Sequence, residues 1–301
     1  MGVKTIIPLP PGTCIDHYSI KRVLGGGGFS IVYLAVDSKT GQEVVIKEYF
    51  PAKMAQRDAD MHVRAKSDES AEMYRLGRKL FFQEASILAS IDHANIVKVL
   101  SFNQSNSTIY LVLEYEKGMS LQSYVRRHGT PVEEVKVKEV FTALLDALSV
   151  VHERGLLHLD IKPGNIYLRE TKGPLLLDFG AVHKILRSAP ARLFPVITHG
   201  FSPPEQSLKN AELGAPTDLY AIGASMRACI EGKPPLSAKE RRKGEVLVPA
   251  SKLFAGQYSE LTLHIMDWCM EMNPAERPKS ARDVLKLLKL EMSPSVVPIP
   301  A

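Results

Sequence analysis

The chain has 301 residues, 45% of them hydrophobic and 24% charged, and its formal net charge is +5 at pH 7. These values are ordinary for a soluble globular protein, and the length leaves room for two lobes with substantial cores. The modest positive charge fits a small polyanionic ligand as well as a nucleic acid, so charge alone identifies no partner.

Three cysteines, Cys14, Cys229 and Cys269, are far apart and form no Cys-x-x-Cys pair. This spacing argues against a zinc site or a disulfide framework and indicates a reducing compartment. No apolar run approaches the ~20 residues that a membrane helix needs, and the N-terminus lacks the apolar region of a signal peptide. We therefore expect a cytoplasmic chain without a membrane segment, or the cytoplasmic-side fragment of a longer protein.

The first part of the chain predicts strands around a glycine turn. Residues 1–13 carry three prolines, which argue against regular structure there, and residues 1–17 are expected to form an N-terminal extension. A strand is expected over 18–24, and the glycine run Gly25–Gly28 then turns the chain into further strands over 29–35 and 43–49.

A helix is expected from about Gly77 to Ile91, because Phe81, Leu88 and Ile91 repeat at helical spacing. Residues 50–76 show no comparable periodicity. The later elements are a strand over 109–115, a polar linker over 116–119, and helices over 121–127, 135–154, 261–271 and 280–291.

Two segments in the second half of the chain carry the strongest chemical signal. In His158–Asn165, Asp160 precedes Asn165 by five residues, and Asp178 follows the apolar run Leu175–Leu177. Short apolar runs on either side of a turn predict a hairpin that folds Asp178 back toward Asn165. Phosphoryl transfer needs such a set: one carboxylate orients the attacking hydroxyl, and an amide and a second carboxylate hold Mg²⁺ on the phosphates of ATP.

In composition and spacing, these segments resemble the catalytic loop and the Asp-Phe-Gly segment of protein kinases. Leu159 departs from the pattern, because most family members have Arg there. Gly25, Gly27 and Val32 fall at the spacing of the family's glycine-rich loop, although Ser30 replaces its third glycine.

Other parts of the chain resemble the same family. Val44–Lys47 is similar to the family's Val-Ala-Ile-Lys, and Thr198–Glu205 to the end of a protein-kinase activation segment. In this family, Glu205 would pair with Arg277, and Asp218 would anchor the backbone of the catalytic loop. Small-molecule kinases lack a segment that receives a peptide, so Thr198–Glu205 favours a protein substrate.

The resemblance implies two sets of site residues. The implied catalytic residues are Lys47, Glu84, Asp160, Lys162, Asn165 and Thr198. The implied contacts to ATP are Leu24, Gly25, Gly26, Gly27, Gly28, Val32, Val45, Lys47, Leu113, Glu114, Tyr115, Glu116, Ser120, Tyr167 and Asp178. Asn165 and Asp178 would hold Mg²⁺, with Mn²⁺ as an alternative.

Within these sets, Lys47 would hold the α- and β-phosphates, and Glu84 would form an ion pair with Lys47. The alternative for Glu84 is an ordinary solvent-facing helix residue. Lys47 and Glu84 are further apart in the chain than we expect for the family, so residues 50–76 are predicted to be an insertion. Asp160 would orient the substrate hydroxyl, and Lys162 would neutralise transferred charge, as in serine/threonine kinases.

The implied fold is α+β and bilobal, with a small N-terminal β-rich lobe and a larger helical C-terminal lobe. The expected boundaries are an extension at 1–17, the N-lobe at 18–115, the hinge and C-lobe at 116–290 and a tail at 291–301. The implied function is an ATP-dependent protein kinase, most like bacterial kinases of the eukaryotic type, that phosphorylates Ser or Thr of proteins and of itself. Its expected partners are ATP and protein substrates, without nucleic acid. The alternatives are a pseudokinase scaffold and a small-molecule kinase.

Overall fold

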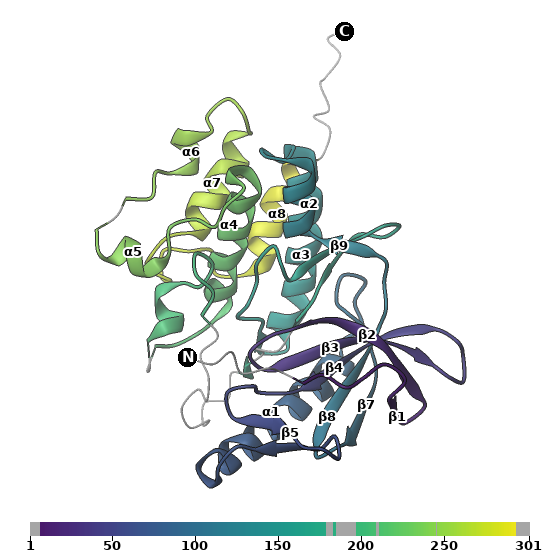
Figure 1. The fold of residues 1–301 in the computed structure, drawn as a ribbon. Helices are drawn as coiled ribbons and strands as arrows, with labels where there is room; N and C mark the ends of the chain where they lie inside the picture. The colour runs from purple at the N-terminus through teal and green to yellow at the C-terminus, as the bar shows by residue number, and fades with distance from the viewer. Residues whose placement is uncertain (1–6, 179–182, 185–196, 209–210, 245, 293–301) are drawn as a thin grey trace. The chain divides into compact units, whose positions relative to one another are not determined.

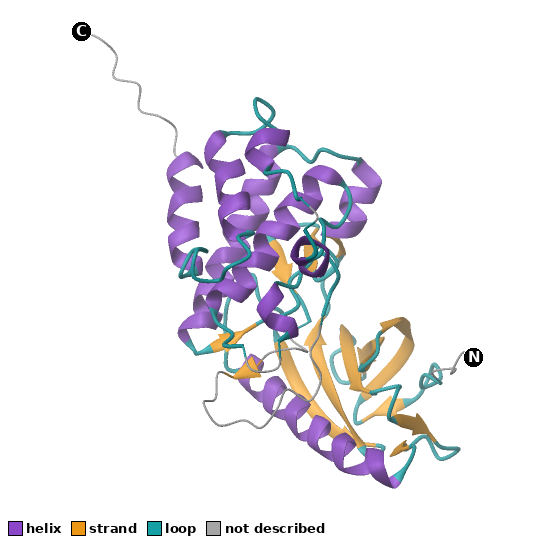
Figure 2. Ribbon diagram, turned by 90° about the vertical axis from the view of Figure 1, so that its left-hand side faces the viewer, coloured by secondary structure: helices purple, strands orange, loops and turns teal. Residues whose placement is uncertain are grey.

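The computed structural model describes residues 7–178, 183–184, 197–208, 211–244 and 246–292 (Figure 1). The chain forms two compact units, which comprise Met1–Asp92 with Val97–Glu116 in unit 1, and His93–Ile96 with Lys117–Ala301 in unit 2. Unit 1 is built on a sheet and unit 2 mainly on helices, so the predicted α+β class is confirmed (Figure 2).

Unit 1 contains a six-stranded antiparallel sheet in the order β1-β2-β3-β4-β8-β7. Its strands are β1 (Cys14–Ile15), β2 (Tyr18–Gly26), β3 (Ser30–Asp37), β4 (Glu43–Tyr49), β7 (Val99–Ser105) and β8 (Thr108–Glu114). Tyr33, Ile46 and Val112 are fully buried in the core against this sheet. Strand β1 lies within the expected N-terminal extension, directly after the residues for which the sequence predicted no regular structure.

Helix α1 (Asp68–Ala89) contacts β7 and β8 in the same unit (Figure 2). The helix begins well before Gly77, which corrects the predicted start. Ser67 caps its N-terminus by accepting a hydrogen bond from the Ser70 N–H. Gly77 lies inside the helix, and a glycine suits this position because a Cβ atom there would meet the Tyr49 hydroxyl at 2.0 Å. It is therefore a packing glycine and not a helix boundary.

The segment between β4 and α1 is folded. It contains a two-stranded hairpin of β5 (Ala55–Arg57) and β6 (Val63–Ala65), with Arg57 opposite Val63. Its Val63 N–H donates to the Asn106 carbonyl in the β7–β8 turn. This packing is long-range, which explains why no local periodicity in the sequence revealed it.

Unit 2 consists mostly of helices. They are α2 (Leu121–His128), α3 (Glu134–Glu153), the 3₁₀ turn η1 (Pro204–Ser207), α4 (Ala215–Glu231), α5 (Ala238–Arg242), α6 (Ala250–Leu253), α7 (Glu260–Cys269) and α8 (Ala281–Met292). Helix α4 is buried from Thr217 to Ile230 and packs on α7, while α3 packs on α8. None of the helices in the described ranges is long and apolar enough to span a bilayer.

Small strands in unit 2 carry the polar loops. Strands β9 (Gly118–Ser120), β11 (Ile166–Arg169) and β12 (Pro174–Leu176) form one sheet, and β10 (Leu156–Leu157) pairs with β13 (His183–Lys184). Strand β9 corrects the expectation that residues 116–119 are only a linker. The hairpin of β11 and β12 is the one that the sequence predicted.

Candidate active site

The Asp218 carboxylate of α4 fixes the backbone of the catalytic-loop segment. The His158 N–H donates to Asp218 Oδ2 at 2.9 Å, and the Leu159 N–H donates to Oδ1 at 2.8 Å. His152 Nε2 also lies 2.9 Å from Oδ2, and the Asp218 side chain is fully buried. The predicted role of Asp218 as the anchor of this loop is therefore confirmed.

The Asp218 carboxyl is also expected to make stability depend on pH. Burial alone would raise its pKa, but the hydrogen bond and charge of His152 and the hydrogen bond from the His158 backbone N–H outweigh burial and lower the pKa. A lowered folded-state pKa contributes stability above the ordinary Asp value of about 4, and this stability is lost as pH falls through the folded-state pKa. Urea unfolding should therefore show a difference in free energy between wild type and Asp218→Asn that is largest near neutral pH and shrinks below pH ~4. A difference that grows in acid would contradict this account.

His158 joins the loop to the strand that leads to Asp178. Its Nδ1 accepts a hydrogen bond from the Asp160 N–H at 3.2 Å, and its Nε2 lies 2.9 Å from the Leu177 carbonyl oxygen. Because Nδ1 accepts and a carbonyl cannot donate, Nε2 carries the proton and donates it to Leu177. The sequence contained His158 within the recognised segment but gave no signal for this bridging role.

Asp160 is the centre of the polar cluster. Its carboxylate accepts hydrogen bonds from Lys162 Nζ at 2.9 and 2.7 Å, from Thr198 Oγ1 at 2.6 Å and from Asn165 Nδ2 at 2.9 Å. The exposed fraction of its side chain is 10%, against 28% for Lys162. The structure thus brings four of the predicted catalytic residues into one hydrogen-bonded group.

Asn165 and Asp178 come together through the β11–β12 hairpin. The Leu177 N–H donates to the Asn165 carbonyl at 2.9 Å, directly before Asp178. The Asn165 amide nitrogen donates to the backbone carbonyl and to the carboxylate of Asp160, so the amide oxygen remains as the atom suited to a cation. An amide oxygen and a carboxylate are the hard ligands that Mg²⁺ prefers, with phosphate oxygens and water completing its shell. The residues present therefore fit a nucleotide-bound divalent ion.

The segment Thr198–Glu205 is held in unit 2 by a buried ion pair. Arg277 donates to both carboxylate oxygens of Glu205, at 2.6 and 3.1 Å, and the Arg277 side chain is fully buried. Its guanidinium also donates to the carbonyls of Glu271 and Pro216. The predicted pairing of Glu205 with Arg277 is confirmed.

Leu159 is accommodated by apolar packing. It is 6% exposed, has a φ of +62° and clusters with Leu157 and Leu213. Gln206 Nε2 donates to the Leu159 carbonyl at 2.6 Å, a contact for which the sequence gave no signal. The side chain thus supports the loop through burial at a position where an Arg would offer charge.

Lys47 lies on β4, with the glycine turn at the neighbouring end of the sheet. Its side chain is buried, and Nζ lies 5.9 Å from the centroid of the Phe81 ring on α1. The backbone of Glu84 is part of α1, but the Glu84 side chain lies outside the described residues, as do Phe179 and Gly180. The predicted ion pair of Lys47 with Glu84 remains a prediction.

The residues predicted to contact ATP are divided between unit 1 and unit 2. In unit 1, Gly25 pairs with Val32, Val32 with Lys47, and Val45 with Leu113 across neighbouring strands. The sheet therefore places Val32 and Lys47 beside the glycine turn.

In unit 2, Ser120 pairs with Tyr167 between β9 and β11, and the Ser120 side chain caps α2 by accepting from the Ser123 N–H at 3.1 Å. The Ser120 hydroxyl also donates to Ser123 Oγ. The predicted contact of Ser120 with ATP therefore competes with a helix cap that the structure already shows.

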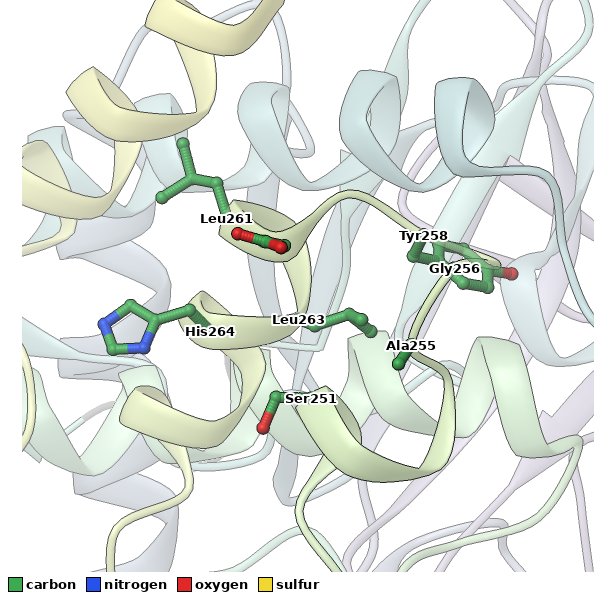
Figure 3. Close-up of a pocket in the computed structure, with 8 residues that line it drawn as sticks. Ser251, Ala255, Gly256, Tyr258, Leu261, Leu263 and His264 are labelled. Atoms are coloured by element: carbon green, nitrogen blue, oxygen red, sulfur yellow. The ribbon is translucent and has the colours of Figure 1, made fainter.

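A separate hollow of about 780 Å³ lies beside α6 and α7 in unit 2 (Figure 3). It is lined by Ser251, Ala255, Gly256, Tyr258, Glu260, Leu261, Leu263 and His264. None of these residues belongs to the polar cluster around Asp160 or to the predicted ATP contacts. The cluster, and not this hollow, carries the chemistry.

Comparison with known proteins identifies the class of this chain. A family model described as the protein kinase domain matches residues 18–287, and the chain therefore belongs to the protein kinase family. The solved structure "PpkA-294 apo form" is similar, with a TM-score of 0.82, 29% identity, and coverage of 93% of this chain and 99% of that one. The predicted bilobal kinase fold is thus confirmed. Members of this family use ATP and divalent metal ions.

Two curated relatives of the chain are bacterial serine/threonine-protein kinases. It is 30% identical to serine/threonine-protein kinase D of Synechocystis sp., over 94% of this chain and 54% of that protein. It is 29% identical to serine/threonine-protein kinase PknA of Nostoc sp., over 91% of this chain and 47% of that protein. The chain therefore spans about half the length of these relatives, and its likeness to bacterial kinases of the eukaryotic type is confirmed.

Proposed function

We propose that this chain transfers the γ-phosphoryl group of ATP to serine or threonine hydroxyls of protein substrates, including its own. The observation that carries the proposal is the hydrogen-bonded group of Asp160, Lys162, Asn165 and Thr198. The names of the Synechocystis and Nostoc relatives support the same activity. The proposed setting is the cytoplasm, with ATP and protein substrates as partners and no nucleic acid.

Each residue of the group has a distinct proposed task. The Asp160 carboxylate accepts the hydrogen bond of the substrate hydroxyl and orients it toward the phosphorus. Lys162 offers its ammonium to the transferred phosphoryl group, and Thr198 holds the Asp160 carboxylate in place. Asn165 and Asp178 supply oxygen ligands to Mg²⁺, or to Mn²⁺, which neutralises phosphate charge when it is bound.

An assay with Mg²⁺ and γ-labelled ATP tests this function against its rivals. A protein kinase should label both itself and an added Ser/Thr-containing protein. A pseudokinase scaffold would bind ATP and label neither, and a small-molecule kinase would release ADP only with a small acceptor. Labelling of tyrosine alone, found by phosphoamino-acid analysis, would also contradict the proposal.

The proposed ion pair of Lys47 with Glu84 predicts non-additive losses. If the two residues act as one unit, Lys47→Met and Glu84→Gln should each lower log kcat/KM, and the double variant should be little worse than the more damaging single one. The measurement is kcat/KM for ATP in all four proteins. Fully additive losses would show that the two side chains act separately.

Leu159 predicts that activity does not depend on phosphorylation of the activation segment. In kinases with Arg at this position, the Arg pairs with a phosphate on that segment, whereas Leu159 offers no donor and no charge. Ser188, the tested acceptor, lies outside the described residues. Ser188→Ala and phosphatase-treated wild type, with the phosphatase removed, should both stay within about tenfold of untreated enzyme, or ~1.4 kcal/mol of barrier. A larger fall in both samples would contradict this prediction.

A further inference from the structure

The glycine turn of unit 1 is hydrogen-bonded to the chain that follows β4. The β3–β4 ladder ends with Ser30 opposite Tyr49, but pairing continues beyond it. The Phe50 N–H donates to the Phe29 carbonyl at 2.8 Å, and the Ala52 N–H donates to the Gly28 carbonyl at 3.1 Å. The intervening residue is a proline, which has no N–H and fits a position where the pairing needs no donor.

Ala52 is held from its other side by the hairpin of β5 and β6. Lys66 Nζ donates to the Ala52 carbonyl, and the Lys66 N–H donates to the Met54 carbonyl at 2.8 Å. The N–H groups of Met54 and Ala55 both donate to the Pro51 carbonyl at 2.8 Å. Residues 51–55 are thus held by hydrogen bonds to the glycine turn on one side and to Lys66, at the end of the hairpin, on the other.

The hairpin is fixed to β4 by a buried charge pair. Arg57 Nη2 lies 2.6 Å from Glu48 Oε2, and both side chains are fully buried. Arg57 also donates to the carbonyls of Ile7 and Met61, at 2.9 and 3.0 Å. Separating Arg57 from Glu48 would leave an uncompensated charge in the interior. The pair and its further hydrogen bonds therefore hold the hairpin in one position on β4.

Phenols complete the surroundings of Glu48. The hydroxyl of Tyr33 donates to Oε2 at 2.7 Å and that of Tyr110 to Oε1 at 2.9 Å. Burial and then the charge of Glu48 raise the pKa of both phenols, so they remain protonated donors throughout the physiological range. Since Glu48 is adjacent to Lys47, the strand of the proposed phosphate-binding lysine and the hairpin share one rigid anchor.

We propose that residues 50–66 form a clasp that presets the glycine turn for the phosphates of ATP, with Ala52 and Lys66 as positioning residues. The proposal rests on the proposed function, because it assumes that this turn covers ATP. Four successive glycines have large conformational freedom, and ordering them on binding would weaken affinity for the nucleotide. Fixing the carbonyls of Gly28 and Phe29 in the free protein removes part of this cost.

The test replaces Lys66 and measures directly whether the hydrogen bonds of the clasp are weakened. Lys66→Met keeps the aliphatic stem but removes the ammonium, Lys66→Arg restores a donor, and Lys53→Met is the control at an exposed lysine of the same segment. Amide hydrogen exchange at Phe50 and Ala52 should become at least about tenfold faster in Lys66→Met and recover in Lys66→Arg. The KM for ATP should rise ~3- to 10-fold while the KM for the protein substrate is unchanged.

The other outcomes would contradict either the existence of the clasp or its effect on ATP binding. Unchanged exchange in Lys66→Met would show that no clasp exists, whatever the activity. Faster exchange with an unchanged KM for ATP would show a structural brace that does not position the nucleotide. If Lys66→Met fails to fold, Ala52→Pro, which removes the N–H that bonds Gly28, is tested instead through exchange at Phe50 and the KM for ATP. If the wild type transfers no phosphoryl group, the proposed function fails, but exchange still decides whether the clasp exists.

Discussion

Asp178→Asn is expected to lower phosphoryl transfer by at least ~10²-fold, or ~2.7 kcal/mol of barrier. The Asp178 carboxylate is the proposed charged ligand of Mg²⁺, and a neutral amide binds the ion less strongly. The backbone should tolerate the change, because Asp178 has a φ of +59° and Asn is among the residues that adopt such values readily. The loss should therefore reflect the metal and not the fold.

The measurement for Asp178→Asn is kcat as a function of Mg²⁺ concentration, with the unfolding midpoint as a check on folding. Asp60→Asn, at an exposed position in unit 1, is the control for charge removal and should behave as wild type. Turnover of Asp178→Asn close to that of wild type at ordinary Mg²⁺ concentrations would remove Asp178 from the proposed metal site.

Arg277→Met should destabilise the protein by about 3–5 kcal/mol. The change leaves the buried carboxylate of Glu205 without its ion-pair partner and removes donors to the carbonyls of Glu271 and Pro216. It also removes the guanidinium that lies 4.9 Å from the Tyr220 ring. Because Arg277 and Glu205 are both buried, the desolvation of Glu205 is then no longer compensated by its partner.

The matched control for Arg277→Met is Arg282→Met. Arg282 also pairs with a glutamate, Glu153, but the two side chains are 59% and 55% exposed. Exposed pairs contribute little, so urea unfolding should show a change of about 0–1 kcal/mol for this control. Equal losses in the two variants would mean that burial does not set the strength of the Glu205–Arg277 pair.

The sequence predicted the polar cluster well because its residues recur at fixed spacing. Asp160, Lys162 and Asn165 lie within six residues of one loop, and the hairpin that returns Asp178 is short. Local geometry therefore brings the side chains of Asp160, Lys162 and Asn165 together and returns the backbone next to Asp178 to Asn165. The anchoring role of Asp218 was accessible only through the family resemblance, because its contacts with His158 and Leu159 join distant parts of the chain.

The segment after β4 shows why other features could not be predicted. The helix was expected to start at about Gly77, where the apolar spacing begins, but its cap is Ser67, and the glycine at position 77 is explained by the position of Tyr49. No local pattern in the sequence distinguishes Arg57 and Glu48 from ordinary charged residues of strands. Their pairing depends on burial between elements that no local pattern brings together.

The most direct test of the account is the single-turnover rate of Asp160→Asn with ATP, Mg²⁺ and a protein substrate. Asp160→Asn keeps the size of the side chain but removes the carboxylate that is proposed to orient the hydroxyl. We expect the rate to fall by at least ~10²-fold, within the range for a positioned acid or base, while the affinity for ATP stays within about threefold. A rate within tenfold of wild type would contradict the central role of Asp160. If the affinity for ATP fell by the same factor as the single-turnover rate, Asp160 would serve nucleotide binding and not the transfer itself.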